Sequence, residues 1–191
     1  MNKPLPRTSA ALAALFVMTH LASASPAPSV EIARRARAER EHAFLVPRPL
    51  VEAFHFFEPV GEKTWAEGWR PIFASEHDAM LHDGSVFTVT APHPSSGAPI
   101  ESVWTISRYD PPHLIEYRNV LPGLRATRIT VRCSAAVPHG TRVTVRYTYH
   151  ALSDGGDAFV AQMTDEKFRG MIESWREAIA AYLARGTPAS P

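Results

Sequence analysis

Residues 164–185, near the C-terminus, constrain the fold of this chain more than any other stretch. At about 100° per residue, its large apolar side chains fall within an arc of roughly 120°. They are Phe168, Met171, Ile172, Trp175, Ile179, Tyr182 and Leu183. Asp165 and Glu166 begin the stretch and Arg185 ends it, an order that suits the helix dipole. The pattern predicts one long amphipathic helix, beginning after a break near Thr164, whose apolar face needs a broad partner surface.

From residue 72 to residue 152 the apolar side chains recur with a period of two, which is typical of strands. A first strand is expected at 42–46, followed by short helical pieces at 48–57 and 62–68. Further strands are expected at 72–75, 85–90, 101–109, 114–120, 126–135 and 142–152. Short turns rich in proline and glycine separate these strands, which indicates an antiparallel meander.

The last two strands each have one apolar and one polar face. In 126–135, Ile129 and Val131 share a face, whereas Arg128 and Arg132 take the other. Such a sheet buries one side only. The expected fold class is therefore α+β: a curved seven-stranded antiparallel sheet around a long C-terminal helix, with two short helices after the first strand.

The N-terminus has the pattern of a secretory signal peptide. Lys3 and Arg7 precede an apolar run at 9–21, and Ala22-Ser23-Ala24 offers a small-residue cleavage site. We therefore expect a signal peptide at 1–24, a linker and leader at 25–40, a folded domain at 41–186 and a disordered tail at 187–191. The expected location is periplasmic or secreted; the alternative is an uncleaved N-terminal helix that anchors the protein.

Composition excludes several classes of partner. The formal net charge is +1, so no nucleic-acid-binding field is implied, and no stable membrane span is expected after cleavage. Cys133 is the single cysteine of the sequence, which excludes an internal disulfide. The sequence assigns no oligomeric state.

Several short motifs, in this element order, resemble the START-like superfamily, also called helix-grip or SRPBCC. They are Phe57-Glu58-Pro59-Val-Gly61-Glu62, Trp65, Gly68-Trp69, Pro71, Val103-Trp104, Tyr109-Asp110-Pro111, Ile115-Glu116-Tyr117, Pro122-Gly123, Tyr147 and Ala151-Leu152-Ser153. Within the superfamily, the chain is most similar to an uncharacterised bacterial group of polyketide-cyclase-like proteins. The resemblance covers roughly residues 41–183 and implies a hydrophobic pocket between sheet and helix.

Aromatic and apolar side chains are the candidate lining of that pocket. The expected ligand-binding residues are Phe54, Trp65, Trp69, Trp104, Tyr117, Tyr147, Tyr149, Met171 and Trp175. Tyrosine hydroxyls and tryptophan N–H groups are able to orient a ligand on such apolar walls. The alternative is that these side chains simply fill the core or close the open end of the sheet.

Catalytic motifs are sparse. Glu62 and Glu116 are the carboxylates expected to approach a pocket, and burial would have to raise the pKa of either one for acid–base work. A second reading gives Glu62 a pairing or capping role. Acidic residues and histidines gather at 76–83, but their spacing matches no metal motif and indicates a solvated loop. No metal and no cofactor are expected.

The favoured function is an exported domain that binds a small hydrophobic molecule, such as a lipid, aromatic or polyketide-like compound. An alternative is a cyclase- or dehydratase-like enzyme that uses a pocket carboxylate or a tyrosine. The second alternative is a filled core that serves as an interaction or stress module.

Overall fold

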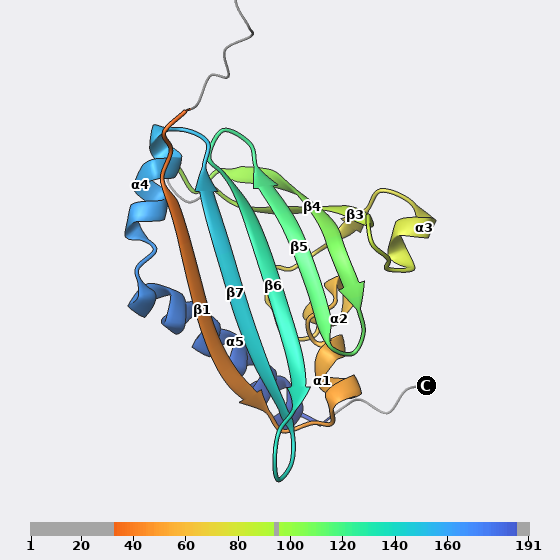
Figure 1. Ribbon diagram of the computed structural model, residues 1–191. Helices are drawn as coiled ribbons and strands as arrows, with labels where there is room; N and C mark the ends of the chain where they lie inside the picture. Colours follow the sequence, from red (N-terminus) through yellow and green to blue (C-terminus); the bar gives the residue numbers. More distant parts are fainter. Residues whose placement is uncertain (1–32, 94–95, 187–191) are drawn as a thin grey trace, which may run out of the picture. The chain divides into compact units, whose positions relative to one another are not determined.

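The computed structural model describes residues 33–93 and 96–186, and those from Arg34 onward lie in one compact unit. Seven strands form one antiparallel sheet in the order β1-β7-β6-β5-β4-β3-β2 (Figure 1). The strands are β1 (Arg37–Val46), β2 (Ile72–Phe73), β3 (Val86–Pro92), β4 (Pro99–Asp110), β5 (Leu114–Leu121), β6 (Arg125–Ala135) and β7 (Thr141–Ala151). The helices are α1 (Leu50–His55), α2 (Pro59–Glu62), α3 (Glu76–Ala79), α4 (Asp154–Gln162) and α5 (Asp165–Ala184). The expected α+β helix-grip fold is confirmed.

Helix α5 lies across one face of the sheet, behind β1 and β7 in the view of Figure 1. Thr164 caps its N-terminus, because the threonine hydroxyl accepts a hydrogen bond from the Lys167 N–H at 3.2 Å. Phe168, Ile172 and Ile179 are buried from this helix, as the apolar stripe predicts. The helix therefore supplies the apolar layer that the sheet needs.

The register of β6 and β7 places their apolar residues on the side that faces α5. Ile129 is opposite Tyr147, and Val131 is opposite Val145. The residues between them, such as Thr130 opposite Arg146, point to the outer face of the sheet. The expected separation of an apolar and a polar face in these strands is confirmed.

The expected start of the first strand, at residue 42, is wrong. Strand β1 begins at Arg37 and pairs with β7 along its whole length, from Arg37 opposite His150 to Val46 opposite Thr141. Charged side chains are tolerated here because β1 is an edge strand with one solvated face. Arg146 of β7 pairs with Glu41 at 2.6 Å on that face. The segment expected to be a leader thus contributes four residues of strand.

The short helices also differ from the expected positions. Residues 59–61, which lie between the two expected helical pieces, form most of α2, because Pro59 occupies the first turn, where a missing N–H costs nothing. The expected helical piece at 62–68 is mostly turn and loop. Residues 76–79, expected as loop, form α3, capped by the Ser75 hydroxyl. The expected signal peptide, residues 25–32 of the linker and the tail at 187–191 lie outside the described residues.

Candidate functional site

A small cavity lies between the inner face of the sheet, α5 and the loop of residues 63–71, which joins α2 to β2. This inner cavity has a volume of about 130 Å³. Its walls are Glu62, Trp65, Ala66, Trp69, Trp104, Tyr117, Ile129, Val131, Tyr147 and Trp175. A cavity of about 150 Å³ in another protein is known to bind benzene. The inner cavity is therefore of the size that accepts one small ring.

Most of the aromatic residues expected to bind a ligand meet at this cavity. Trp65, Trp69, Trp104, Tyr117, Tyr147 and Trp175 all line it. These include all four tryptophans of the chain. Trp65 of the loop and Trp175 of α5 are in contact, with ring centroids 5.6 Å apart. The interior is thus partly filled by aromatic rings, and the inner cavity is the space that they leave.

Three of the expected ligand-binding residues do not border the inner cavity. Phe54 of α1 is fully buried and contacts Tyr109 instead. Tyr149 is 2% exposed and packs against Phe159 of α4, because it lies further along β7. Met171 of α5 is half-buried and packs against the core without facing the cavity.

Glu116 does not approach the cavity, contrary to expectation. Strand residues alternate between faces, so Tyr117 points inward and its neighbour Glu116 points to the outer face. There Glu116 accepts hydrogen bonds from Ser107 at 2.8 Å and Thr130 at 3.2 Å, and it pairs with Arg118. Glu116 is therefore a structural residue of the exposed sheet face.

Most of the polar aromatic groups around the cavity already have protein partners. The N–H groups of Trp65, Trp69 and Trp104 donate to the Phe56 carbonyl, the Pro59 carbonyl and the Ser102 hydroxyl, at 2.7, 2.8 and 2.9 Å. The Tyr117 hydroxyl donates to the Phe57 carbonyl at 2.7 Å. These bonds fix the rings in place. The N–H groups of the three tryptophans are therefore already used, whereas the Tyr117 hydroxyl is still able to accept a hydrogen bond.

Three polar groups of the cavity wall have no hydrogen-bond partner among the described residues: the Glu62 carboxyl, the Tyr147 hydroxyl and the Trp175 N–H. Burial raises the pKa of the Glu62 carboxyl well above its ordinary value, which favours its protonated form. Burial, followed by the neighbouring Tyr149 and Glu62, raises the pKa of the Tyr147 phenol. The cavity thus offers polar groups that are uncharged and available.

Glu62→Gln is expected to reduce the dependence of stability on pH. Because the pKa of Glu62 is higher in the folded state, its contribution to stability is complete below the unfolded-state pKa and is lost as pH rises through the folded-state pKa. Each pKa unit of difference corresponds to about 1.4 kcal/mol. The free energy of unfolding, measured with urea at about pH 5 and about pH 8, gives this loss. Glutamine does not ionise, so the variant lacks this contribution to the pH dependence.

Glu101→Gln provides the control, because Glu101 is exposed on β4 and the same change in charge occurs in solvent. This variant should keep the pH dependence of the unaltered protein. A Glu62→Gln variant with an equally unchanged pH dependence would show that the Glu62 carboxyl is solvated.

A second space, the side pocket, shares Ala66, Trp69 and Trp104 with the inner cavity. Its volume is about 300 Å³, the lower limit for pockets that hold drug-sized ligands. Trp69 and Trp104 stand between the two spaces, with ring centroids 5.2 Å apart. These two rings therefore form a wall that the inner cavity and the side pocket share.

Sequence reasoning missed two polar residues of the side pocket, Asn119 and Arg125. Arg125 was outside the strand expected at 126–135, but β6 begins with it. Extending the alternation of Ile129 and Val131 by four residues places Arg125 on the inner face. The alternation in the sequence was therefore sufficient to place Arg125 on the inner face, but the expected strand began one residue too late to include it.

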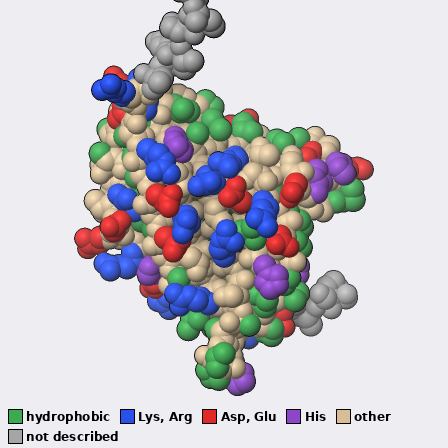
Figure 2. Space-filling model, in the orientation of Figure 1, with side chains coloured by type: hydrophobic (Ala, Val, Ile, Leu, Met, Phe, Trp, Pro, Cys, Tyr) green, Lys and Arg blue, Asp and Glu red, His purple; other side chains and the backbone are tan. Residues whose placement is uncertain are grey.

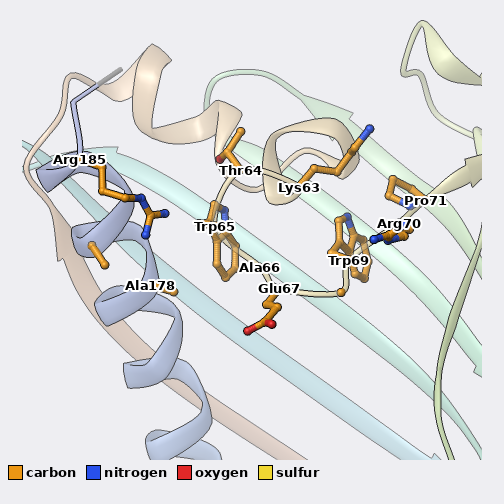
Figure 3. A pocket seen from close by; sticks show the side chains of 12 residues that line it. Lys63, Thr64, Trp65, Ala66, Glu67, Trp69, Arg70, Pro71, Ala178 and Arg185 are labelled. Carbon is orange, nitrogen blue, oxygen red and sulfur yellow. The ribbon is translucent and has the colours of Figure 1, made fainter. Parts of the chain in front are cut away.

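The outer groove lies on the solvent side of the 63–71 loop and has a volume of about 700 Å³. Figure 3 shows Trp65 and Trp69 projecting from the loop, and Arg185 reaching toward it from the end of α5. The outer groove shares Trp65, Ala66 and Trp69 with the inner cavity. The loop therefore lies between the outer groove and the inner cavity.

Several of the acidic and histidine residues at 76–83 make local contacts. Asp78 accepts a hydrogen bond from the Val86 N–H at 3.0 Å, and the His77 and His82 rings are in contact with each other. Within residues 33–93 and 96–186, no group of three or more histidine, cysteine, aspartate or glutamate side chains is placed to hold a metal ion.

The outer face of the sheet carries charges of both signs, as Figure 2 shows. Arg146 lies between Glu39 and Glu41, at 3.7 and 2.6 Å. Such mixing gives no strong field of one sign. In the described part of the chain, no helix combines the length and the apolar character needed to cross a bilayer.

The curved sheet and the long C-terminal helix that lies on its inner face together form a helix-grip fold. No protein-family model and no curated protein matches the sequence. Solved structures do match. The Mll3558 protein from Rhizobium loti is 18% identical, with a TM-score of 0.57, over 76% of this chain and 99% of that one.

Two further solved structures are informative. Ara h 8.0201 is 16% identical, with a TM-score of 0.56, over 78% of this chain and 99% of its own. DynU16, a protein in the dynemicin biosynthetic locus, is 15% identical, with a TM-score of 0.53, over 80% of this chain and 49% of its own. At these identities the likeness shows the fold, and at that level the resemblance expected from the sequence is confirmed.

Proposed function

We propose that this protein binds a small hydrophobic molecule in the inner cavity and side pocket. The observation that carries the proposal is a small cavity lined mostly by aromatic and aliphatic side chains, together with Glu62, Tyr147 and Trp175, whose polar groups have no hydrogen-bond partner among the described residues. A few placed polar groups on apolar walls are typical of ligand sites, and a ligand that hydrogen-bonds with these groups is held in one orientation. The ligand is therefore an apolar molecule with a ring or short chain and one hydrogen-bonding group.

Ala66→Phe is the variant that tests where binding occurs, because Ala66 borders the inner cavity, the side pocket and the outer groove. A phenyl ring at this position would occupy the space that a ligand needs. Titration with the fluorescent apolar probe N-phenyl-1-naphthylamine should show binding to the unaltered protein. Ala66→Phe should weaken that binding about tenfold or more, a loss of about 1.4 kcal/mol or more.

Ala180→Phe adds the same ring on the exposed side of α5 and should leave the affinity unchanged. Native mass spectrometry of the purified protein, before and after solvent extraction, should also reveal a bound small molecule. If the unaltered protein takes up neither this probe nor fatty acids, and carries no extractable molecule, the proposed binding function is wrong.

A role in proton transfer is the second candidate function, and the state of Glu62 favours it. A general acid must be protonated near neutral pH and must face the substrate. Glu62 has a raised pKa and lines the cavity. Incubation of the protein with the extracted molecule tests this role: Glu62→Gln would abolish its conversion but not its binding. Binding without any conversion by the unaltered protein leaves the binding function alone.

We also propose that the protein is exported. The support is the charged, apolar and small-residue order of residues 1–24. Expression of the full chain in a bacterial host should yield a periplasmic or secreted protein that lacks these residues, as intact-mass measurement would show. A full-length protein held in the membrane fraction would favour the anchored alternative.

A further inference from the structure

An arginine on the inner face of the sheet has no acidic partner. Arg125, the first residue of β6, points into the side pocket, whereas the arginines at 128 and 132 point to the outer face. Within the described residues, no carboxylate lies within 4.0 Å of its guanidinium. A charge withdrawn from water is costly unless it is paired. Arg125 is therefore a positively charged group of the side pocket that is able to bind an anionic ligand.

The surroundings of Arg125 hold its side chain in place. Its Nη1 atom donates to the Asn119 amide oxygen at 3.0 Å and to the Thr127 hydroxyl at 2.8 Å. Asn119 and Thr127 are each 3% exposed. The guanidinium also lies over the Phe159 ring of α4, at 4.9 Å from the ring centroid. These contacts use neutral groups only, so they orient the arginine without neutralising it.

The remaining donors of Arg125 are free. The Nε atom is buried without a partner, and Nη2 has no partner among the described residues. A guanidinium with unused donors matches the oxygens of a carboxylate or a similar group. Desolvation lowers the pKa of Arg125, but a guanidinium stays charged at neutral pH. Glu67, at the rim of the same pocket, is exposed and is not paired with it.

We propose that the ligand is an organic acid whose anionic oxygens bind Arg125 in the side pocket while its apolar part extends past Trp69 and Trp104 into the inner cavity. This inference rests on the proposed function and adds the chemical class of the ligand. The pocket provides both parts of the site, because Trp69 and Trp104 line the side pocket and the inner cavity alike.

Two probes that share one apolar body test this inference. N-phenyl-1-naphthylamine is neutral, and 8-anilino-1-naphthalenesulfonate has the same rings with an added sulfonate. The unaltered protein should bind the anionic probe more tightly. Arg125→Met should weaken binding of the anionic probe about tenfold or more and leave binding of the neutral probe within about twofold. Arg125→Lys should restore part of the preference.

Arg70→Met is the control, because Arg70 is an exposed arginine of the outer groove and its removal causes the same change in net charge. This variant should alter the ratio of the two affinities by less than about twofold. If Arg125→Met unfolds the protein, Arg125→Lys and Arg125→Gln, checked by circular dichroism, supply the comparison.

The outcomes separate the two proposals. If both probes bind and their ratio does not respond to Arg125, the hydrophobic-ligand function stands and the assignment of an organic acid is overturned. Equal weakening of both probes in folded Arg125 variants also overturns it, because the role of Arg125 is then structural. If the unaltered protein binds neither probe, the proposed function fails and this inference fails with it.

Discussion

Phe168→Ala is expected to lower the free energy of unfolding by about 3–5 kcal/mol, the range observed when a fully buried phenylalanine is truncated. Phe168 is 1% exposed and lies in the first turns of α5. Its ring contacts that of Tyr147 on β7, with centroids 5.4 Å apart. The substitution therefore opens a void where the helix meets the sheet, and the surrounding aromatic rings cannot close it without losing their own contacts.

Urea unfolding followed by far-ultraviolet circular dichroism measures this effect. Arg169→Ala, at the next and exposed position of α5, should change the free energy by no more than about 0.5 kcal/mol. Trp175→Ala should cost less than Phe168→Ala, because Trp175 is half-buried and already borders the inner cavity. A loss below about 1 kcal/mol for Phe168→Ala would mean that α5 is not held by the sheet.

Gly156→Ala is expected to destabilise the protein by about 3 kcal/mol or more, because the added methyl group has no space. The methyl carbon would lie 2.0 Å from the Leu124 carbonyl oxygen, which is backbone and already accepts a hydrogen bond from Leu152. Either α4 or the β5–β6 turn must therefore move. Such a movement would also separate Phe159 from Arg125.

Gly155→Ala is the matched control, one residue earlier in the same helix. Its methyl carbon would meet only side-chain atoms, at 3.6 and 3.7 Å, which is ordinary contact. Alanine has the higher helix propensity, so this variant should be neutral or more stable by up to about 1 kcal/mol. Thermal melting of the two variants provides the comparison. Equal melting temperatures would show that α4 is not docked as closely as the structure places it.

The strongest periodic patterns of the sequence were sufficient for the fold. The apolar stripe at 164–185 predicted α5 to within one residue at each end, because a wide hydrophobic arc agrees with acidic residues in the first turn and an arginine at the end. Alternation in β6 and β7 gave the correct faces. When all local signals favour the same secondary structure, an element is predictable without knowledge of its tertiary contacts.

Elements that depend on tertiary contacts were harder to predict. The first residues of β1 are charged, and they become strand because β7 provides hydrogen-bonding partners along the whole edge. The strand expected at 72–75 is shorter in the structure, because only two residues, Ile72 and Phe73, pair with Thr88 and Phe87 of β3. Helices α2 and α3 have four residues each, too short for a periodic signal.

The site was predicted in part, for similar reasons. The aromatic residues predicted most of the lining of the inner cavity, because large rings from the inner face of the sheet, from α5 and from the 63–71 loop pack in the space between helix and sheet. Glu116 was misplaced, although alternation with Tyr117 would have put it outside. Bond partners were not predictable: nothing local indicates that the Trp65 N–H donates to the Phe56 carbonyl. Polar groups without a hydrogen-bond partner, such as the Glu62 carboxyl, are identified only when the partners of all neighbouring groups are known.

Energy transfer from tryptophan to bound N-phenyl-1-naphthylamine is the measurement that tests the central claim most directly. Every tryptophan of the chain lines the inner cavity, so tryptophan emission reports on this one place. We expect saturation at one probe per chain, with strong loss of tryptophan emission and a matching rise of probe emission. A probe that binds without affecting tryptophan emission, or that does not bind at all, would show that the space between the sheet and α5 is not a ligand site.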